Sequence, residues 1–325
     1  MHSLKSTSPS PENRLPRVRA VHGIVLVTAA VAALAPTGVL AAETRSWEAS
    51  IQTFVGNDSN APIAAQDTTY SGQRSSSFMG IGASGQWHFP AAGEWRPSIA
   101  GHLTMLTYAN SEANQFRYAS GGGTFALARD VPSLNGALQL TVGLQRDRLG
   151  GRVYASSYSL GAALPVQVGA WLLTPGLGLT SIDFADDGTV SSITSRDAKI
   201  ERLGISASRE LARNHWLSLG YSYVVNRADG SNFDYHGNAF DVQYRAMIFP
   251  VILTIAASRN SERYPDYTPE PRRSQDNRMY RLGLTVPLSG RVSLEGTYSI
   301  TEYRGKSALF DANRNQATLG IAYRF

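Results

Sequence analysis

The chain has 325 residues, with 30 basic and 25 acidic side chains, a formal net charge of +5 and no cysteine. The lack of cysteine excludes disulfide bonds, thiolate chemistry, cysteine-ligated zinc and an N-terminal lipid-anchored cysteine. Four basic residues and one acidic residue fall within the first 20 positions, so the rest of the chain carries 26 basic and 24 acidic residues. It contains no Lys/Arg-rich run that would predict binding to nucleic acid.

The N-terminal segment predicts export. Lys5, Arg14, Arg17 and Arg19 precede an apolar run over residues 24–35. This run is shorter than the roughly 20 apolar residues of a membrane-spanning helix. With small residues at its end, it predicts a secretory signal peptide over residues 1–41, cut after Ala41 or Ala42. The alternative is a retained helical anchor. Residues 42–325 are expected to form one domain.

Strand-like stretches fill the rest of the chain, and no helical segment is expected there. About fourteen stretches alternate between apolar and polar or small residues, the period of a strand. Each is long enough for a tilted transmembrane strand, which needs about 9–11 residues. They cover residues 46–56, 75–89, 95–109, 115–129, 136–148, 153–166, 169–182, 198–211, 215–227, 235–247, 250–261, 277–288, 291–304 and 313–325.

The connections between these stretches also alternate. Those after even-numbered stretches are short, whereas those after odd-numbered ones are mostly longer and polar, above all 57–74, 185–197 and 262–276. Short turns at one end and long loops at the other are typical of an outer-membrane barrel. Both termini are then expected on the periplasmic side of a Gram-negative outer membrane. Asp186 and Asp187, within one long loop, fit a solvated turn better than a hard-cation site.

The last stretch carries the clearest signal. Leu319, Ile321, Tyr323 and Phe325 alternate with small or polar residues. One apolar face ending in aromatic residues suits the lipid side of a barrel strand. The terminal Phe325 also resembles the closing strand of Gram-negative outer-membrane barrels. We therefore expect outer-membrane lipid and the barrel-assembly machinery as partners, the latter through this C-terminal strand.

The fold class that follows is an all-β, transmembrane, antiparallel up-and-down β-barrel of about fourteen strands with a polar lumen. On one stretch, Leu138, Leu140, Val142 and Leu144 would face lipid, and the residues between them would face inward. The alternative, a soluble β-sandwich, would place polar and charged side chains on its buried face, at several kcal/mol for each unpaired group.

One pattern in the sequence has a possible chemical meaning. Residues 80–85 match G-x-G-x-x-G, but the dinucleotide motif requires a following helix, and strand continues here. A strand with a small lumen face explains it better. The sequence has no G-x-S-x-G elbow and no metal-type histidine spacing. Catalytic residues, cofactor and metal are therefore not expected.

Charged residues with inward parity are the best candidates for a functional site. They could pair across the lumen and occlude it, or line a polar path and set its selectivity. The expected lumen-lining residues are His102, Asp147, Arg202, Asp241, Arg245, Arg281, Glu295 and Arg324.

The last third of the chain resembles the barrel part of surface lipoprotein assembly modifiers. The resemblance lies in residues 229–238, in Asn260-Ser261-Glu262-Arg263-Tyr264, in 272–276 and in 310–316 before the last strand. It implies a fourteen-stranded barrel that helps deliver lipoproteins to the cell surface. Members of that family carry periplasmic helical repeats before the barrel. This chain would be a barrel-only relative, with a separate periplasmic or exported protein as partner.

The leading functional hypothesis is a transport or export pore, either porin-like or a surface-export barrel. One alternative is an outer-membrane barrel enzyme acting on lipid or peptide, with a site assembled across strands. The other is a structural or surface-binding barrel whose loops carry the function.

Overall fold

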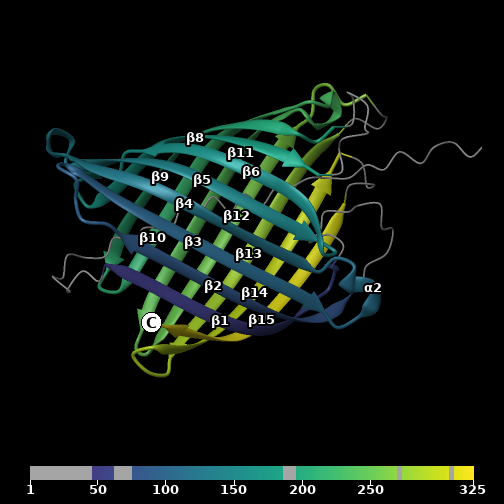
Figure 1. The fold of residues 1–325 in the computed structure, drawn as a ribbon, viewed down its shortest axis with the longest axis horizontal. Coiled ribbons are helices and arrows are strands. Elements are labelled where there is room, and N and C mark those ends of the chain that lie inside the picture. Colours follow the sequence, from purple (N-terminus) through teal and green to yellow (C-terminus); the bar gives the residue numbers. More distant parts are fainter. Residues whose placement is uncertain (1–45, 62–74, 186–194, 269–272, 307–310) are drawn as a thin grey trace, which may run out of the picture.

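The computed structural model describes residues 46–61, 75–185, 195–268, 273–306 and 311–325. These residues form one antiparallel sheet that closes on itself into a barrel (Figure 1). No helix in this described part is long and apolar enough to cross a membrane. The signal peptide expected over residues 1–41, Asp186 and Asp187 lie outside the described residues.

The strands agree with the period-two pattern of the sequence. Their bounds are β1 (Trp47–Asp58), β2 (Ser76–His88), β3 (Trp95–Tyr108), β4 (Tyr118–Val131), β5 (Gly136–Leu149), β6 (Arg152–Ala163), β7 (Val166–Val168), β8 (Trp171–Phe184), β9 (Ala198–Ala212), β10 (His215–Ala228), β11 (Tyr235–Ile248), β12 (Val251–Arg263), β13 (Ser274–Pro287), β14 (Val292–Gly305) and β15 (Ala312–Arg324).

The wall has fourteen strand positions. Each strand pairs with its neighbours in sequence, and β1 pairs with β15 to close the ring. Strands β6 and β7 share one position, because both lie between β5 and β8. The break between them contains Pro165, which has no amide hydrogen to donate to the ladder. The predicted fourteen-stranded antiparallel barrel is confirmed.

The outer face of the wall is apolar. Ile51 on β1 pairs with Tyr323 on β15 and with Ala83 on β2, and directly paired residues point to the same side of the sheet. The large exposed hydrophobic side chains of the strand interiors lie on this face. Examples from five strands are Val55, Leu103, Val142, Leu177 and Leu319, which are between 42% and 56% exposed. Exposed apolar side chains in this number are explained by contact with lipid.

The two ends of the barrel differ. The connection that contains α2 (Ser111–Asn114) lies at one end and the C-terminus at the other (Figure 1). We name these the loop end and the turn end. Aromatic residues mark the outer face at the turn end, as at a membrane–water interface. They are Trp47, Trp87, Phe89, Trp171, Phe249 and Phe325.

Three details differ from the sequence-based expectations. Helix α2 contradicts the expectation of no helix. It is one turn long, and the side chain of Asn110 stabilises it by capping its N-terminus. The connection after β5 is a tight turn, because Gly150 and Gly151 adopt positive φ angles that glycine tolerates. Several strands run two or three residues further toward the loop end than expected, which brings Asp58 and Glu262 into β1 and β12.

The G-x-G-x-x-G segment lies inside β2, and no helix follows it. Gly80 and Gly82 face the lumen, where Phe54 lies over the first and Gln52 over the second. A Cβ at position 82 would lie 2.7 Å from the amide nitrogen of Gln52. These glycines therefore make room for lumen side chains rather than for a phosphate.

Candidate functional site: the barrel lumen

The inner wall is made of polar and small side chains. On β5 the inward residues are Gln139, Thr141, Gly143, Gln145 and Asp147. Gly143 pairs with Thr124 on β4, and Asp147 pairs with Ser120. Near the middle of the barrel, inward side chains are exposed, among them Gln52, His102, Asp241 and Arg281. A packed apolar core does not fill this part of the lumen.

The structure places all eight candidates, seven charged residues and His102, on the inner face. The register aligns Asp147 with Ser120, Arg202 with Val224, Asp241 with Gly220 and Arg281 with Ser299. His102 aligns with Ser84, Arg245 with Trp216, Glu295 with Gly320 and Arg324 with Ser50.

These eight residues do not form one compact site. Within the described part of the chain, none of them makes an ion pair with another residue within 4.0 Å. Asp147 accepts hydrogen bonds from the Tyr118 hydroxyl at 2.8 Å and the Gln145 amide at 3.0 Å. Glu295 accepts one from the Ser293 hydroxyl at 3.2 Å. Asp147 and Glu295 are thus held by neutral neighbours, and within the described residues no ion pair across the lumen is observed among the eight candidates.

The charges are concentrated on one wall. Arg202, Asp241, Arg281 and Arg245 lie on β9, β11 and β13, from near the loop end to near the turn end. The carboxylate of Asp241 lies over Gly220, where any Cβ would collide with it. On the opposite wall, β2 to β6 present mainly Ser, Thr, Gly and Gln to the lumen. One side of the lumen therefore carries three arginines around Asp241, with Glu210 and Glu262 toward its two ends, and the other side is mostly neutral.

Toward the loop end the lumen side chains are buried. A first cluster contains Phe78, Tyr108, Ala61, Ala113 and Phe116, with Phe54 packed against it. The rings of Phe54 and Phe78 meet edge to face at 6.3 Å, and those of Phe78 and Tyr108 at 6.0 Å. Ala113 belongs to α2, so this connection packs onto the inner face of the wall.

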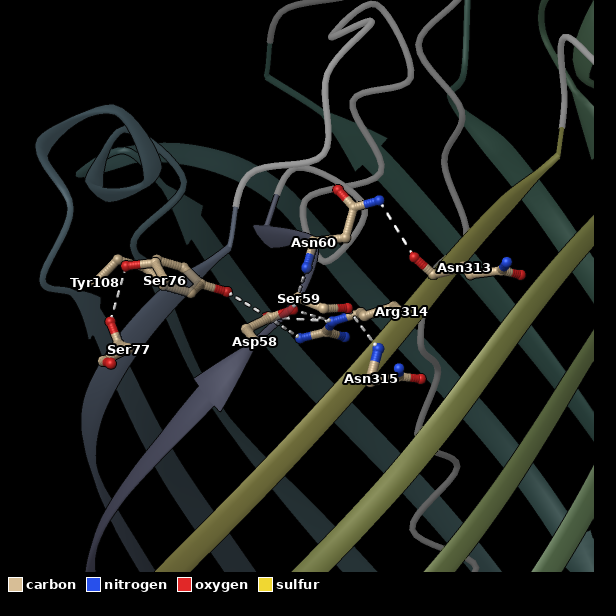
Figure 2. A network of polar contacts seen from close by, with 9 residues as sticks. All are labelled: Asp58, Ser59, Asn60, Ser76, Ser77, Tyr108, Asn313, Arg314 and Asn315. Carbon is tan, nitrogen blue, oxygen red and sulfur yellow. Dashed lines mark hydrogen bonds and ion pairs between the residues drawn. The ribbon is translucent and has the colours of Figure 1, made fainter.

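A buried ion pair adjoins the first cluster. Asp58 is fully buried, and its carboxylate receives Nη2 of Arg314 at 2.7 Å and the Tyr108 hydroxyl at 3.0 Å. The backbone amide of Asn60 donates to the same carboxylate at 3.0 Å. Figure 2 shows these groups converging on Asp58, with Ser59 and Asn315 bonded beside them. The network spans the β1–β15 closure, where the N-terminal and C-terminal strands meet.

Two further clusters line the loop end. On β6 and β8, the Arg196 guanidinium lies 4.4 Å from the ring centre of Phe184 and donates to the Tyr154 hydroxyl at 3.2 Å. On the β12–β13 side, Tyr264 donates to the buried Glu262 at 2.6 Å, and Arg273 covers the Tyr264 ring at 3.9 Å. Burial raises the pKa of the Tyr264 phenol well above its usual range, so it remains a donor.

Together the three clusters narrow the loop end of the lumen. They occupy the inner face on β1–β3, β6–β8 and β12–β13, which are spread around the ring. A cavity of only about 20 Å³ remains between the second and third clusters, beside Phe184, Tyr235 and Arg273. Inward side chains are therefore packed together at the loop end and exposed in the middle of the lumen.

Sequence reasoning missed the residues of these clusters. Asp58 and Glu262 were expected in loops, because the first and eleventh stretches were ended too early. Arg314 has inward parity in the last stretch, so parity alone could have found it. No signal in the sequence pairs Arg314 with Asp58, since 256 positions separate them.

The described residues hold no group of three or more histidine, aspartate or glutamate side chains arranged to bind a metal. His215 is bonded to the Tyr244 hydroxyl at 2.6 Å, at the turn end. His102 faces the lumen beside Gly122.

Comparison with known proteins adds one partial family match. Residues 187–324 match the family described as a protein of unknown function, DUF2860. The match covers less than half of the chain, and no curated protein matches the chain. The matched segment includes the residues that resemble surface lipoprotein assembly modifiers, and that resemblance stays a prediction.

Solved structures with similar folds are outer-membrane proteins. An anion-selective porin from Comamonas acidovorans is 12% identical with a TM-score of 0.47, and the match covers 86% of this chain and 98% of that one. OpdK from Pseudomonas aeruginosa, solved with vanillate, is 12% identical with a TM-score of 0.43 and covers the same shares. OmpT of Vibrio cholerae is 9% identical with a TM-score of 0.44, and the match covers 86% and 97%. Similarity of this degree says nothing of what the present chain transports or binds.

Proposed function

We propose that this chain is an outer-membrane channel for the passive diffusion of small polar solutes. The observation that supports it is the middle of the lumen, where polar inward side chains such as Gln52, His102 and Arg281 are exposed. A scaffold barrel without a path would bury such groups against one another, because unpaired buried charges are costly.

The proposal includes an orientation. Short turns and both termini would face the periplasm and the loop end would face outward, as in other barrels of this class. The three clusters at the loop end then form the narrow outer part of the channel. Solutes would meet the narrowest part of the path there.

Liposome swelling tests the proposal. Liposomes with the folded barrel are diluted into isotonic solutions of neutral sugars of increasing size. We expect swelling with the smallest polyols and sugars, and a sharp fall with disaccharides, because the loop end is narrow. Protein-free liposomes provide the control, and swelling no faster than theirs with any solute would contradict a diffusion channel. A gated export barrel would then account better for the polar lumen.

A further inference from the structure

Three arginines change the character of the outer wall near the loop end. On β5 the outward row runs Leu138, Leu140, Val142 and Leu144, and then continues as Arg146 and Arg148. The register sets Arg146 opposite Gly121 and Arg148 opposite Ala119. Those two β4 residues pair in turn with Leu103 and Met105, which belong to the exposed apolar face. Both arginines therefore stand outside the barrel, directly above its apolar wall.

Arg117, the residue directly before β4, joins them. Residues two apart on a strand lie about 7 Å apart, and diagonal neighbours on paired strands about 7–8 Å. Arg117 precedes Ala119 by two positions, so it is a diagonal neighbour of Arg148. Its side chain lies over the β5–β6 turn, where a Cβ on Gly151 would come within 2.6 Å of the guanidinium. We name Arg117, Arg146 and Arg148 the arginine cluster.

The arginine cluster lacks protein counter-charges. In the described part of the chain, none of its three guanidinium groups makes an ion pair or side-chain hydrogen bond, and all three residues are exposed. Three other outward arginines toward the loop end are paired: Arg227 with Glu201 at 3.1 Å, and Arg259 and Arg278 with Asp276 at 2.8 and 3.3 Å.

The nearest outward carboxylate in the register belongs to Asp183. It lies two strands from Arg146, because Ser156 pairs with both of these residues. Neighbouring strands lie about 4.8 Å apart, so the backbones at Arg146 and Asp183 are about 10 Å apart. Three positive charges thus face outward without a neutralising partner.

An apolar surface lies just below the arginine cluster. Leu144 and Tyr158 stand opposite each other on β5 and β6, and they are 61% and 67% exposed. Beside them on β4, Gly121 and Gly123 carry no side chain, so the outer wall has a shallow depression there. Hydrocarbon could lie on this surface while a headgroup reaches the guanidinium groups.

We propose that the arginine cluster binds the phosphate groups of a phosphorylated lipid headgroup in the leaflet at the loop end. Guanidinium groups match phosphate oxygens with paired hydrogen bonds, and each basic residue at a membrane surface adds to the attraction of anionic lipid. A lipid is favoured over free phosphate because the cluster stands at the top of the exposed apolar wall. The site lies outside the lumen and is separate from the proposed channel.

Lipid retention measured by native mass spectrometry tests this site. Protein from the host outer membrane is delipidated and reloaded with either bis-phosphorylated lipid A or its dephosphorylated form. Wild type is expected to retain the phosphorylated form at least about tenfold better. The variant Arg117→Gln/Arg146→Gln/Arg148→Gln should lose this preference, and the corresponding lysine variant should keep part of it. The matched control Arg227→Gln/Arg259→Gln/Arg278→Gln removes three paired arginines and should behave as wild type.

Equal retention of the two lipid forms by wild type would overturn the proposal, as would an equal loss in the control variant. Displacement of the bound lipid by inorganic phosphate alone would also overturn it, because it would indicate a free-phosphate site. Heat-modifiable gel migration checks folding. If the triple glutamine variant does not fold, Arg146→Gln and Arg148→Gln are measured singly, and each must lower retention of the phosphorylated form.

Discussion

At the scale of single residues, Asp58 is the most constrained charge in the described structure. Its carboxylate is fully buried and accepts hydrogen bonds from Arg314, Tyr108 and the backbone of Asn60 (Figure 2). The partners come from three separate parts of the chain, on β15, on β3 and just after β1. Asp58 therefore connects the closure of the barrel to the first loop-end cluster.

The substitution Asp58→Ala is expected to destabilise the barrel strongly. It leaves the guanidinium of Arg314 largely buried without its partner, and loss of one member of a buried pair costs about 3–5 kcal/mol. Urea unfolding in lipid vesicles measures the free energy of unfolding. The control Arg96→Gln breaks the exposed pair of Arg96 with Asp130 and should lower the free energy of unfolding much less, because solvent screens exposed pairs. Equal losses in the two variants would show that burial of the Asp58 pair has no special role.

At the scale of the strand, each element has a lipid face and a lumen face. On β3, Leu103 faces outward and is 42% exposed, while its neighbour His102 faces the lumen. Adjacent residues of one strand thus meet lipid and water in turn, which provides a direct test of the face assignment.

The two neighbouring substitutions Leu103→Arg and His102→Arg should have opposite outcomes. An arginine on the lipid face near the middle of the bilayer costs about 2–4 kcal/mol. The same side chain inside a wet lumen should change the free energy of unfolding little. Urea unfolding of both variants in the same vesicles compares them, and a larger loss for His102→Arg would mean that the faces are reversed.

The strands were predictable because their pattern is local. Alternation in β5 or β15 is visible in a few consecutive residues, and the length of each stretch matches the bilayer. The break at Pro165 and the helical turn α2 were missed, since both depend on short-range detail that the apolar pattern does not carry. Strand ends were also missed toward the loop end, where Asp58 and Glu262 continue β1 and β12 with polar residues.

The loop-end clusters could not be predicted from local pattern. Arg314 and Asp58 meet only because β1 pairs with β15, and Arg273 covers the Tyr264 ring only once β12 and β13 are in register. The inward parity of the eight lumen candidates did follow from the sequence. Their lack of mutual ion pairs within the described structure required the three-dimensional arrangement.

At the scale of the whole molecule, the lumen has exposed polar side chains in its middle and buried, packed side chains at its loop end. Charge lies unevenly in it, because Arg202, Arg245 and Arg281 share one wall with Asp241, and the other carboxylates of that wall, Glu210 and the buried Glu262, lie toward its two ends. Rings or rows of cationic side chains favour anions in a pore. We therefore expect the channel to prefer anions.

The most direct test of this account is the single-channel current of the folded barrel in a planar bilayer under a salt gradient. The account predicts a steady open current with a reversal potential that indicates anion preference. In Arg202→Gln/Arg281→Gln the current should persist while the reversal potential moves toward cation preference. A bilayer that stays silent with correctly inserted protein, or a reversal potential unchanged by these substitutions, would contradict it.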